Sequence, residues 1–268
     1  MPAGPDPKDT ARASSPPDLI ANQALAVALH TLDTRYPGAG FAFVGGSIMR
    51  GQGTFGSDID MVVLFPGVER AWRESFIMDG FPVEAFVHDG ATLGRFFERD
   101  VEHGRPVMIS LAAEGRLVGS RVEEAAGLRA RAQFLLDAGP APLAGERLEL
   151  MLYQISDLAD DLRGRRDRGE VMAIAVALYP KLVDLILLGQ RRWTGAGKWL
   201  QRRLVQADPD LASQMESAMA EAVGGDGGAL LALCCAELDR HGGPVFADFR
   251  RLSDVEGRGG AAMKGCPV

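Results

Sequence analysis

Residues 43–65 read FVGGSIMRGQGTFGSDIDMVVLF, and this stretch decides the expected fold. FAFV at 41–44 and DIDMVVLF at 58–65 are apolar runs that we expect to form central strands, separated by a Gly-Gly turn and a glycine-rich spacer. Side chains two apart on a strand point to the same face, so Asp58 and Asp60 project together from the start of the second strand. The pattern predicts paired carboxylates at the edge of a buried sheet.

Two interpretations of this pair compete. An Asp-x-Asp pair is usually a solvated strand end or a turn. Here it opens a buried strand, which would hardly accept two unpaired charges without compensation such as a metal ion. Glu84, on the expected strand VEAFVH, could aim a third carboxylate at Asp58 and Asp60, although it could instead be a cross-strand partner of Arg73. Three hard oxygen ligands favour Mg²⁺ or Mn²⁺.

The segment GGSIMRG at 45–51 has the composition of a phosphate-binding turn. Gly45 and Gly46 allow the backbone to come close to a ligand, and amides at the start of a following helix can hold phosphate oxygens. Ser47 adds a hydroxyl, and Arg50, one turn later, can fork onto a triphosphate. Such a segment alone is usually only a turn. Its position before the Asp pair favours a nucleotide site.

Together these residues resemble the signature of the polymerase-beta-like nucleotidyltransferase superfamily. In that family Gly-Ser, a spacer of about ten residues (48–57 here) and Asp-hydrophobic-Asp are followed by a third carboxylate on a later strand. The Arg three positions after Ser47 and the Ser directly before Asp58 are similar to small bacterial members such as kanamycin nucleotidyltransferase. The resemblance covers residues 41–88 well, and the rest of the chain offers no diagnostic motif.

The resemblance implies a reaction and a set of roles. NMP would pass from an NTP, with ATP the first choice, to a hydroxyl of a small-molecule acceptor, with release of pyrophosphate and dependence on Mg²⁺ or Mn²⁺. The implied catalytic and metal-binding residues are Asp58, Asp60 and Glu84. The implied nucleotide-binding residues are Gly46, Ser47, Arg50 and Ser57.

The remaining pattern predicts an α+β protein, in which a small mixed-sheet nucleotidyltransferase domain (18–120) is followed by a helical-bundle domain (121–243). Residues 1–17 are expected to be a disordered arm and 244–268 a loose tail, because both contain little to bury. Asp79-Gly80 predicts a hairpin turn. Helices are expected over 19–32, 91–103, 106–113, 122–137, 143–165, 169–188, 209–223 and 228–240, and further strands over 72–78, 83–88 and 116–119.

Composition limits the class of partner. The 268 residues carry a formal charge of −7, which argues against an extended nucleic-acid footprint and favours a small acceptor. Aminoglycosides are one candidate class, because a polycation would be attracted to an acidic cleft. No uninterrupted run of about 18 apolar residues and no signal-peptide pattern occur, so we expect a cytoplasmic protein without a membrane partner. The three cysteines, Cys234, Cys235 and Cys266, are expected to be free thiols.

The helical half offers weaker candidates. A general base could come from one of several carboxylates, although the first three could equally form a solvated face paired with arginines. These carboxylates are Asp157, Asp160, Asp161, Glu170 and Asp184. Lys181 and Lys198 could contact a polyphosphate, or Lys181 could pair with Asp184 and Lys198 could lie on the surface. His88 and His103 are assigned no role.

Two rival functions remain open. The chain could modify a protein or tRNA, as the nucleotidyltransferase of a toxin–antitoxin pair does, or it could be a non-catalytic nucleotide-binding regulator. The presence of all three carboxylates disfavours the regulator. We expect the acceptor to bind between the sheet of residues 41–119 and the helices after 143, because a metal-binding face needs a second wall to position an attacking hydroxyl.

Overall fold

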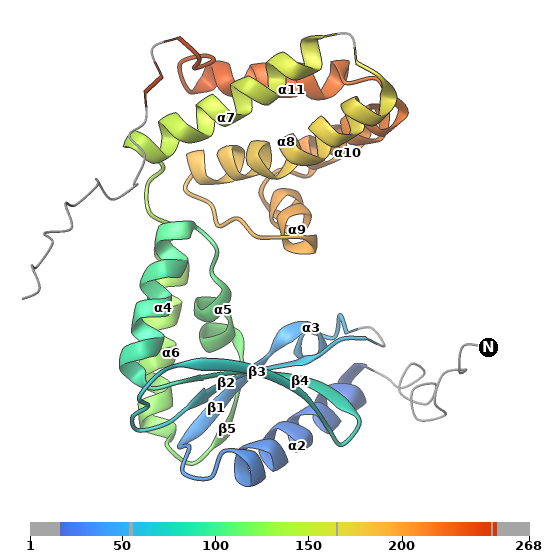
Figure 1. The fold of residues 1–268 in the computed structure, drawn as a ribbon. Coiled ribbons are helices and arrows are strands. Elements are labelled where there is room, and N and C mark those ends of the chain that lie inside the picture. Colours follow the sequence, from blue (N-terminus) through green and yellow to red (C-terminus); the bar gives the residue numbers. More distant parts are fainter. Residues whose placement is uncertain (1–16, 54–55, 165, 248, 251–268) are drawn as a thin grey trace, which may run out of the picture.

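The computed structural model describes residues 17–53, 56–164, 166–247 and 249–250. The expected arm lies outside the described residues except at Pro17, and so does the expected tail beyond residue 250. The described chain folds as the expected α+β protein, with one mixed sheet followed by a helical region (Figure 1).

The sheet has five strands in the order β3-β4-β2-β1-β5. The pair β2–β4 is parallel and the other neighbouring pairs are antiparallel. The strands are β1 (Phe41–Gly45), β2 (Ile59–Leu64), β3 (Trp72–Met78), β4 (Phe81–His88) and β5 (Arg116–Gly119). The expected hairpin is confirmed, because Asp79 and Gly80 between β3 and β4 both have positive φ, as a two-residue type I′ turn requires.

The two faces of the sheet are buried by different helices. Helix α2 (Pro17–Arg35) covers the face to which Met61 and Val63 point. The opposite face, with Phe43 and Val62, is covered by the helices that follow the hairpin (Figure 1). These helices are α4 (Gly90–His103), α5 (Val107–Glu114) and α6 (Val122–Ala138). Alternation along β2 therefore decides that Asp60, in phase with Val62, lies on the α5 side.

Helix α6 packs with the sheet, although strand patterns end before it begins. Ala125 and Ala132 are buried in the same apolar cluster as Phe41 and Phe43. The sequence predicts a domain boundary at residue 121 because strand patterns end there. The end of the strand patterns indicates that helices follow, but it does not indicate which apolar core those helices join. Helix α6 thus belongs to the apolar cluster of the sheet.

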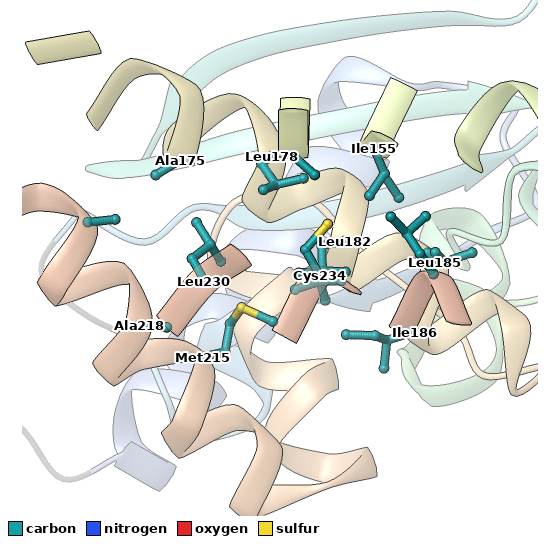
Figure 2. Packing of buried hydrophobic residues seen from close by; sticks show 14 of the residues in the cluster. Ile155, Ala175, Leu178, Leu182, Leu185, Ile186, Met215, Ala218, Leu230 and Cys234 are labelled. Carbon is teal, nitrogen blue, oxygen red and sulfur yellow. The ribbon is translucent and has the colours of Figure 1, made fainter. Parts of the chain in front are cut away.

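The later helices form a second apolar cluster around α8 (Arg168–Gly189). Figure 2 shows Leu178, Leu182 and Leu185 of α8 packed among side chains of the neighbouring helices. Those helices are α7 (Gly145–Arg163), α9 (Lys198–Ala207), α10 (Pro209–Gly224) and α11 (Gly228–Arg240). All were expected except α9, whose buried apolar residues are only Leu200 and Leu204. So few apolar positions, after a glycine-containing loop, gave too short a periodic signal.

Helix α8 is long and apolar enough to cross a membrane by length and composition alone. Half of its most apolar window is buried inside the fold, against α7, α9, α10 and α11. Lys181 and Asp184 interrupt the apolar sequence of α8. The sequence therefore contains no uninterrupted apolar run long enough to indicate a membrane span. The packing of α8 is that of a central core helix.

Candidate functional site

Three carboxylates meet at one edge of the sheet. Asp60 on β2 and Glu84 on β4 are register partners on neighbouring parallel strands, so their side chains stand side by side. Asp58 directly precedes β2 and is half-buried, like the other two. One oxygen from each carboxylate lies within 4.8 Å of the others. The structure thus brings together the three residues that the sequence proposed as metal ligands, and their oxygens suit a hard divalent cation.

The charge of this cluster is incompletely balanced by the chain. Burial raises the pKa of Asp60, and together with the neighbouring carboxylates of Asp58 and Glu84 it brings this pKa to about 6. Arg50 and Lys198 act in the opposite direction. A divalent cation would stabilise the charged form of a carboxylate that is buried beside two others in this way. The residues present therefore fit a metal ion.

Glu84 also makes the contact that the competing interpretation foresaw. Arg73 on β3 donates to its carboxylate in a short ion pair. The Arg73 side chain is 63% exposed, whereas that of Glu84 is 16% exposed. The two interpretations are therefore compatible, because Glu84 can exchange an exposed arginine for a metal ion without leaving its place on β4.

Gly46 is required by the close approach of the backbone to Asp60. It begins the short helix α3 (Gly46–Met49) directly after β1 and has a φ of +91°. A Cβ atom at this position would overlap Oδ2 of Asp60. Only glycine combines this backbone conformation with room for the carboxylate. The Gly-Gly turn expected from the sequence therefore also shapes the proposed metal site, because it leaves room for the Asp60 carboxylate.

The two ends of the spacer are joined by a hydrogen bond. Ser47 Oγ donates to Ser57 Oγ across 3.0 Å, and both side chains are buried. The bond brings the residue after Gly46 next to the residue before Asp58. The structure therefore gathers Gly46, Ser47 and Ser57 around the carboxylates, as the resemblance implied.

A pocket of about 440 Å³ opens beside the carboxylates, between the sheet and the helical half. Gly46, Asp60 and Glu84 line it from the sheet. Residues of α5 and of α9, with the loop before α9, form the other walls. Figure 1 shows α9 as the part of the helical half that reaches toward α3 and α5. The pocket lies where the acceptor was expected to bind.

Arg50 reaches into this pocket and meets α9 there. Its guanidinium lies 3.7 Å from Glu114 of α5 and 4.8 Å from the centre of the Trp199 ring. Arg202 and Arg203 lie 5.0 and 5.9 Å from the same ring. Guanidinium groups at such distances are held by the electrons of the aromatic face. Arg50 is therefore pre-positioned by a residue of the other half of the chain.

Sequence reasoning missed three residues of this wall. Trp199, Arg203 and Glu114 all line the pocket. Burial lowers the pKa of Arg203, and Glu114 opposes that shift. The run KWLQRR at 198–203, with an aromatic residue among basic ones, was the available signal. Lys198 had been considered, and its charge does act on Asp60.

Among the other candidates of the helical half, Asp157 is absent from the described lining of the pocket, and three more have local partners. Asp160 pairs with Arg163 and Asp161 with Arg166, as the interpretation of a solvated face expected. Glu170 belongs to the N-terminal capping box of α8. The proposed bases therefore lie outside the described lining of the pocket.

Two further candidates are held elsewhere in the fold. Asp184 accepts from Arg105 at 3.0 Å and from Thr194 Oγ1 at 2.6 Å. Lys181 donates to Gln154 at 2.9 Å and not to Asp184, so the ion pair considered from the sequence is wrong. His88 is buried against Phe96, and burial lowers its pKa to about 4, which leaves it a neutral packing residue.

The two described cysteines and His103 do not line the pocket. Cys234 and Cys235 are free thiols, as expected, and Cys266 lies outside the described residues. The His103 ring is bound to the carbonyl oxygen of Arg99 in its own helix.

Comparison with known proteins adds little. No protein-family model matches the chain, and no curated protein matches it. Among solved structures it is similar to a nucleotidyltransferase-like protein from Exiguobacterium sibiricum, with 13% sequence identity and a TM-score of 0.40. The alignment covers 81% of this chain and 75% of that one. At this level of similarity we infer neither activity nor site from that structure.

Proposed function

We propose that this chain is a metal-dependent nucleotidyltransferase, which moves NMP from an NTP to a hydroxyl of an acceptor and releases pyrophosphate. The observation that supports it most is the convergence of Asp58, Asp60 and Glu84 within 4.8 Å beside a glycine turn. Asp58 and Asp60 come from one segment and Glu84 from a later strand, and the carboxylates of all three meet at one point. ATP is the first NTP to test.

The residues of the site would have different roles in such a reaction. Mg²⁺ or Mn²⁺ bound by the three carboxylates would neutralise the charge that develops on the phosphoryl oxygens. Gly46 lets the backbone approach the phosphates, and Ser47 offers a hydroxyl beside it. Arg50, with the Arg203 guanidinium near the same Trp199 ring, would supply positive charge for the leaving pyrophosphate.

Removal of a metal ligand tests the proposal. We expect Asp58→Ala and Asp60→Ala to abolish pyrophosphate release from ATP, measured with Mg²⁺ and a panel of alcohols, tRNA and proteins as acceptors. Neither carboxylate belongs to an apolar core cluster, so circular dichroism should show an intact fold. Asp33→Ala, an exposed carboxylate on α2, is the matched control. Turnover by the Asp60→Ala protein at the parent rate would refute the site.

The regulator remains distinguishable from the enzyme. If the parent protein binds ATP with metal in calorimetry but releases no pyrophosphate with any acceptor, nucleotide binding without turnover is favoured. If tRNA or a protein is the acceptor that supports release, the toxin-type function is favoured. Release with a small alcohol supports the proposal as stated.

Binding of the NTP itself can be tested at Arg50. We expect Arg50→Ala to weaken ATP binding by about 1.5 to 3 kcal/mol, the range for a hydrogen bond to a charged group. Ser47→Ala should weaken it less, because a neutral hydroxyl is lost. Calorimetric titration with ATP and Mg²⁺ measures both, with the exposed Arg70→Ala as control. Unchanged affinity in Arg50→Ala would place the triphosphate elsewhere.

A further inference from the structure

The order of the strands determines on which side of the carboxylates the proposed triphosphate contacts lie. From β1 through β2 to β4, neighbouring strands present the Gly46 turn, Asp60 and Glu84 in that order. On β3, Ser75 is the register partner of Glu84, and Arg73, two residues away, extends its guanidinium to the Glu84 carboxylate. The proposed triphosphate contacts, Ser47 and Arg50, both follow β1. The phosphate side of the site is therefore the β1 side, and the carboxylates separate it from the β4–β3 side.

In-line displacement assigns the other side to the acceptor. The attacking oxygen and the leaving pyrophosphate must lie on opposite sides of the phosphorus atom. With pyrophosphate held on the β1 side, the attacking hydroxyl approaches from the β4–β3 side. This step rests on the proposed function. It makes the residues of the pocket beyond Glu84 the acceptor wall.

The acceptor wall carries positive charge. Arg73 is the register partner of Phe86, and its guanidinium lies 5.2 Å from the centre of that ring. Both residues line the pocket from the sheet, and Arg105, which precedes α5 and pairs with Asp184 of α8, lines the same pocket from the helices.

The charge of the pocket differs from that of the whole chain. The chain carries −7, yet four arginines line the pocket, Arg50, Arg73, Arg105 and Arg203, against the carboxylates of Asp60, Glu84 and Glu114. Two of these three carboxylates belong to the proposed metal site. An acidic cleft that attracts a polycation is therefore not what this pocket offers.

We propose that the acceptor is a small hydroxyl compound bearing an anionic group, phosphate or carboxylate, which is bound by Arg73 together with Arg105. Arg73 pairs with Glu84 in the structure, and a metal ion on Glu84 would release its guanidinium. Nearly two thirds of that side chain is exposed, so it can turn to a ligand. A guanidinium fork matches both phosphate and carboxylate oxygens.

Matched acceptors test the charge that the pocket prefers. The probes are glycerol phosphate, glycerol and aminopropanediol, with a sugar phosphate, its sugar and its amino sugar as a second set, and inorganic phosphate alone. Binding is measured by calorimetry with Mn²⁺ and a non-hydrolysable ATP analogue present. We expect the anionic member of each set, and inorganic phosphate, to bind at least about tenfold more tightly than the neutral member, and the amines to bind weakest.

Variants then assign the preference to residues. Arg73→Gln and Arg105→Gln should each reduce the anionic preference at least about tenfold, while ATP binding without an acceptor stays within about twofold. Arg70→Gln, at an exposed position outside the pocket, should leave both unchanged. The ion pair between Arg105 and Asp184 of α8 joins the sheet to the helical half. Asp184→Asn breaks this ion pair but keeps the Arg105 guanidinium, so it tests whether the preference depends on the guanidinium or on the ion pair. It should retain the preference.

Several outcomes would overturn the assignment. Equal or tighter binding of the neutral or amine members contradicts an anionic acceptor. Loss of ATP binding in Arg73→Gln without an acceptor would make this residue part of the nucleotide site. Transfer to tRNA but to no small phosphate monoester would exclude a small acceptor. The proposed function fails separately, when the parent protein shows no metal-dependent binding of ATP or releases no pyrophosphate with any acceptor.

Discussion

At the scale of single residues, the site depends on a backbone approach that no side chain would tolerate. Gly46 meets Asp60 so closely that a Cβ atom would overlap its carboxylate, and its φ of +91° is unfavourable for other residues. The same position follows β1 directly, so the strand aims the turn at the carboxylates. A residue that looks replaceable in sequence therefore controls the geometry of the proposed metal site.

Gly46→Ala should weaken metal binding as well as stability. We expect a loss of about 1 to 2 kcal/mol in the free energy of unfolding, from the positive φ. Displacement of Asp60 should weaken Mn²⁺ binding, measured by calorimetry, at least tenfold, about 1.4 kcal/mol. Gly56→Ala is the control, since a Cβ there meets nothing within 4 Å. Normal Mn²⁺ affinity in Gly46→Ala would show that Asp60 has room to move.

At the scale of elements, α9 supplies what the sheet lacks. The sheet gathers the carboxylates, but the residues that hold Arg50 in the pocket come from α5 and α9. Trp199 lies under three guanidinium groups, those of Arg50, Arg202 and Arg203. Arg202 and Arg203 belong to α9 itself, so the helix brings positive charge to the pocket. Its Trp199 ring also positions Arg50, which follows β1.

Trp199→Ala should therefore weaken binding of the NTP without touching the carboxylates. Loss of the ring removes cation–π contacts worth about 0.5 to 2 kcal/mol, so the dissociation constant for ATP should rise roughly twofold to thirtyfold. Mn²⁺ binding in the absence of nucleotide should not change. Trp199→Phe, which keeps an aromatic face, should lie between the two in the same titration. Parent-like ATP affinity in Trp199→Ala would leave the ring a packing role only.

At the scale of the whole molecule, the pocket exists because two cores are held against each other. Thr194 donates its backbone N–H to the carbonyl oxygen of Gly104, and Arg105 pairs with Asp184 of α8. Trp193 is buried in the apolar cluster of the sheet and donates its Nε1–H to the carbonyl oxygen of Leu136. The loop before α9 is thus anchored on the sheet side. This anchoring places α9 over the carboxylates.

Truncation separates the contributions of the two cores. A chain ending at residue 141 keeps the sheet with α4, α5 and α6, so circular dichroism should show a folded sheet that binds Mn²⁺ but transfers no NMP. A chain ending at residue 121 lacks α6, and its exposed apolar surface should cause unfolding or aggregation. Equal thermal stability of the two truncated chains would contradict the packing of α6, and transfer at the full-length rate by the longer one would remove α9 from the reaction.

Local patterns in the sequence were enough for the described strands, for the long helices other than α9, and for the carboxylates. Apolar alternation and the Asp79-Gly80 turn predicted the strands and the hairpin, and residues 43–65 placed Asp58 and Asp60 on one face of a strand. These features depend on neighbours in the chain, whose spacing is set by the geometry of strands and helices. The third carboxylate was reached as well, since Glu84 lies on a recognisable strand.

Tertiary structure alone decided which distant residues share the pocket. The parallel pairing of β2 with β4 made Asp60 and Glu84 register partners, and the anchored loop before α9 brought Trp199 and Arg203 to Arg50. The net charge of the chain suggested an acidic cleft, whereas the folded pocket gathers four arginines. Composition counts charges without their positions, and electrostatic interactions depend on distance and burial, which only the packing of the two cores determines.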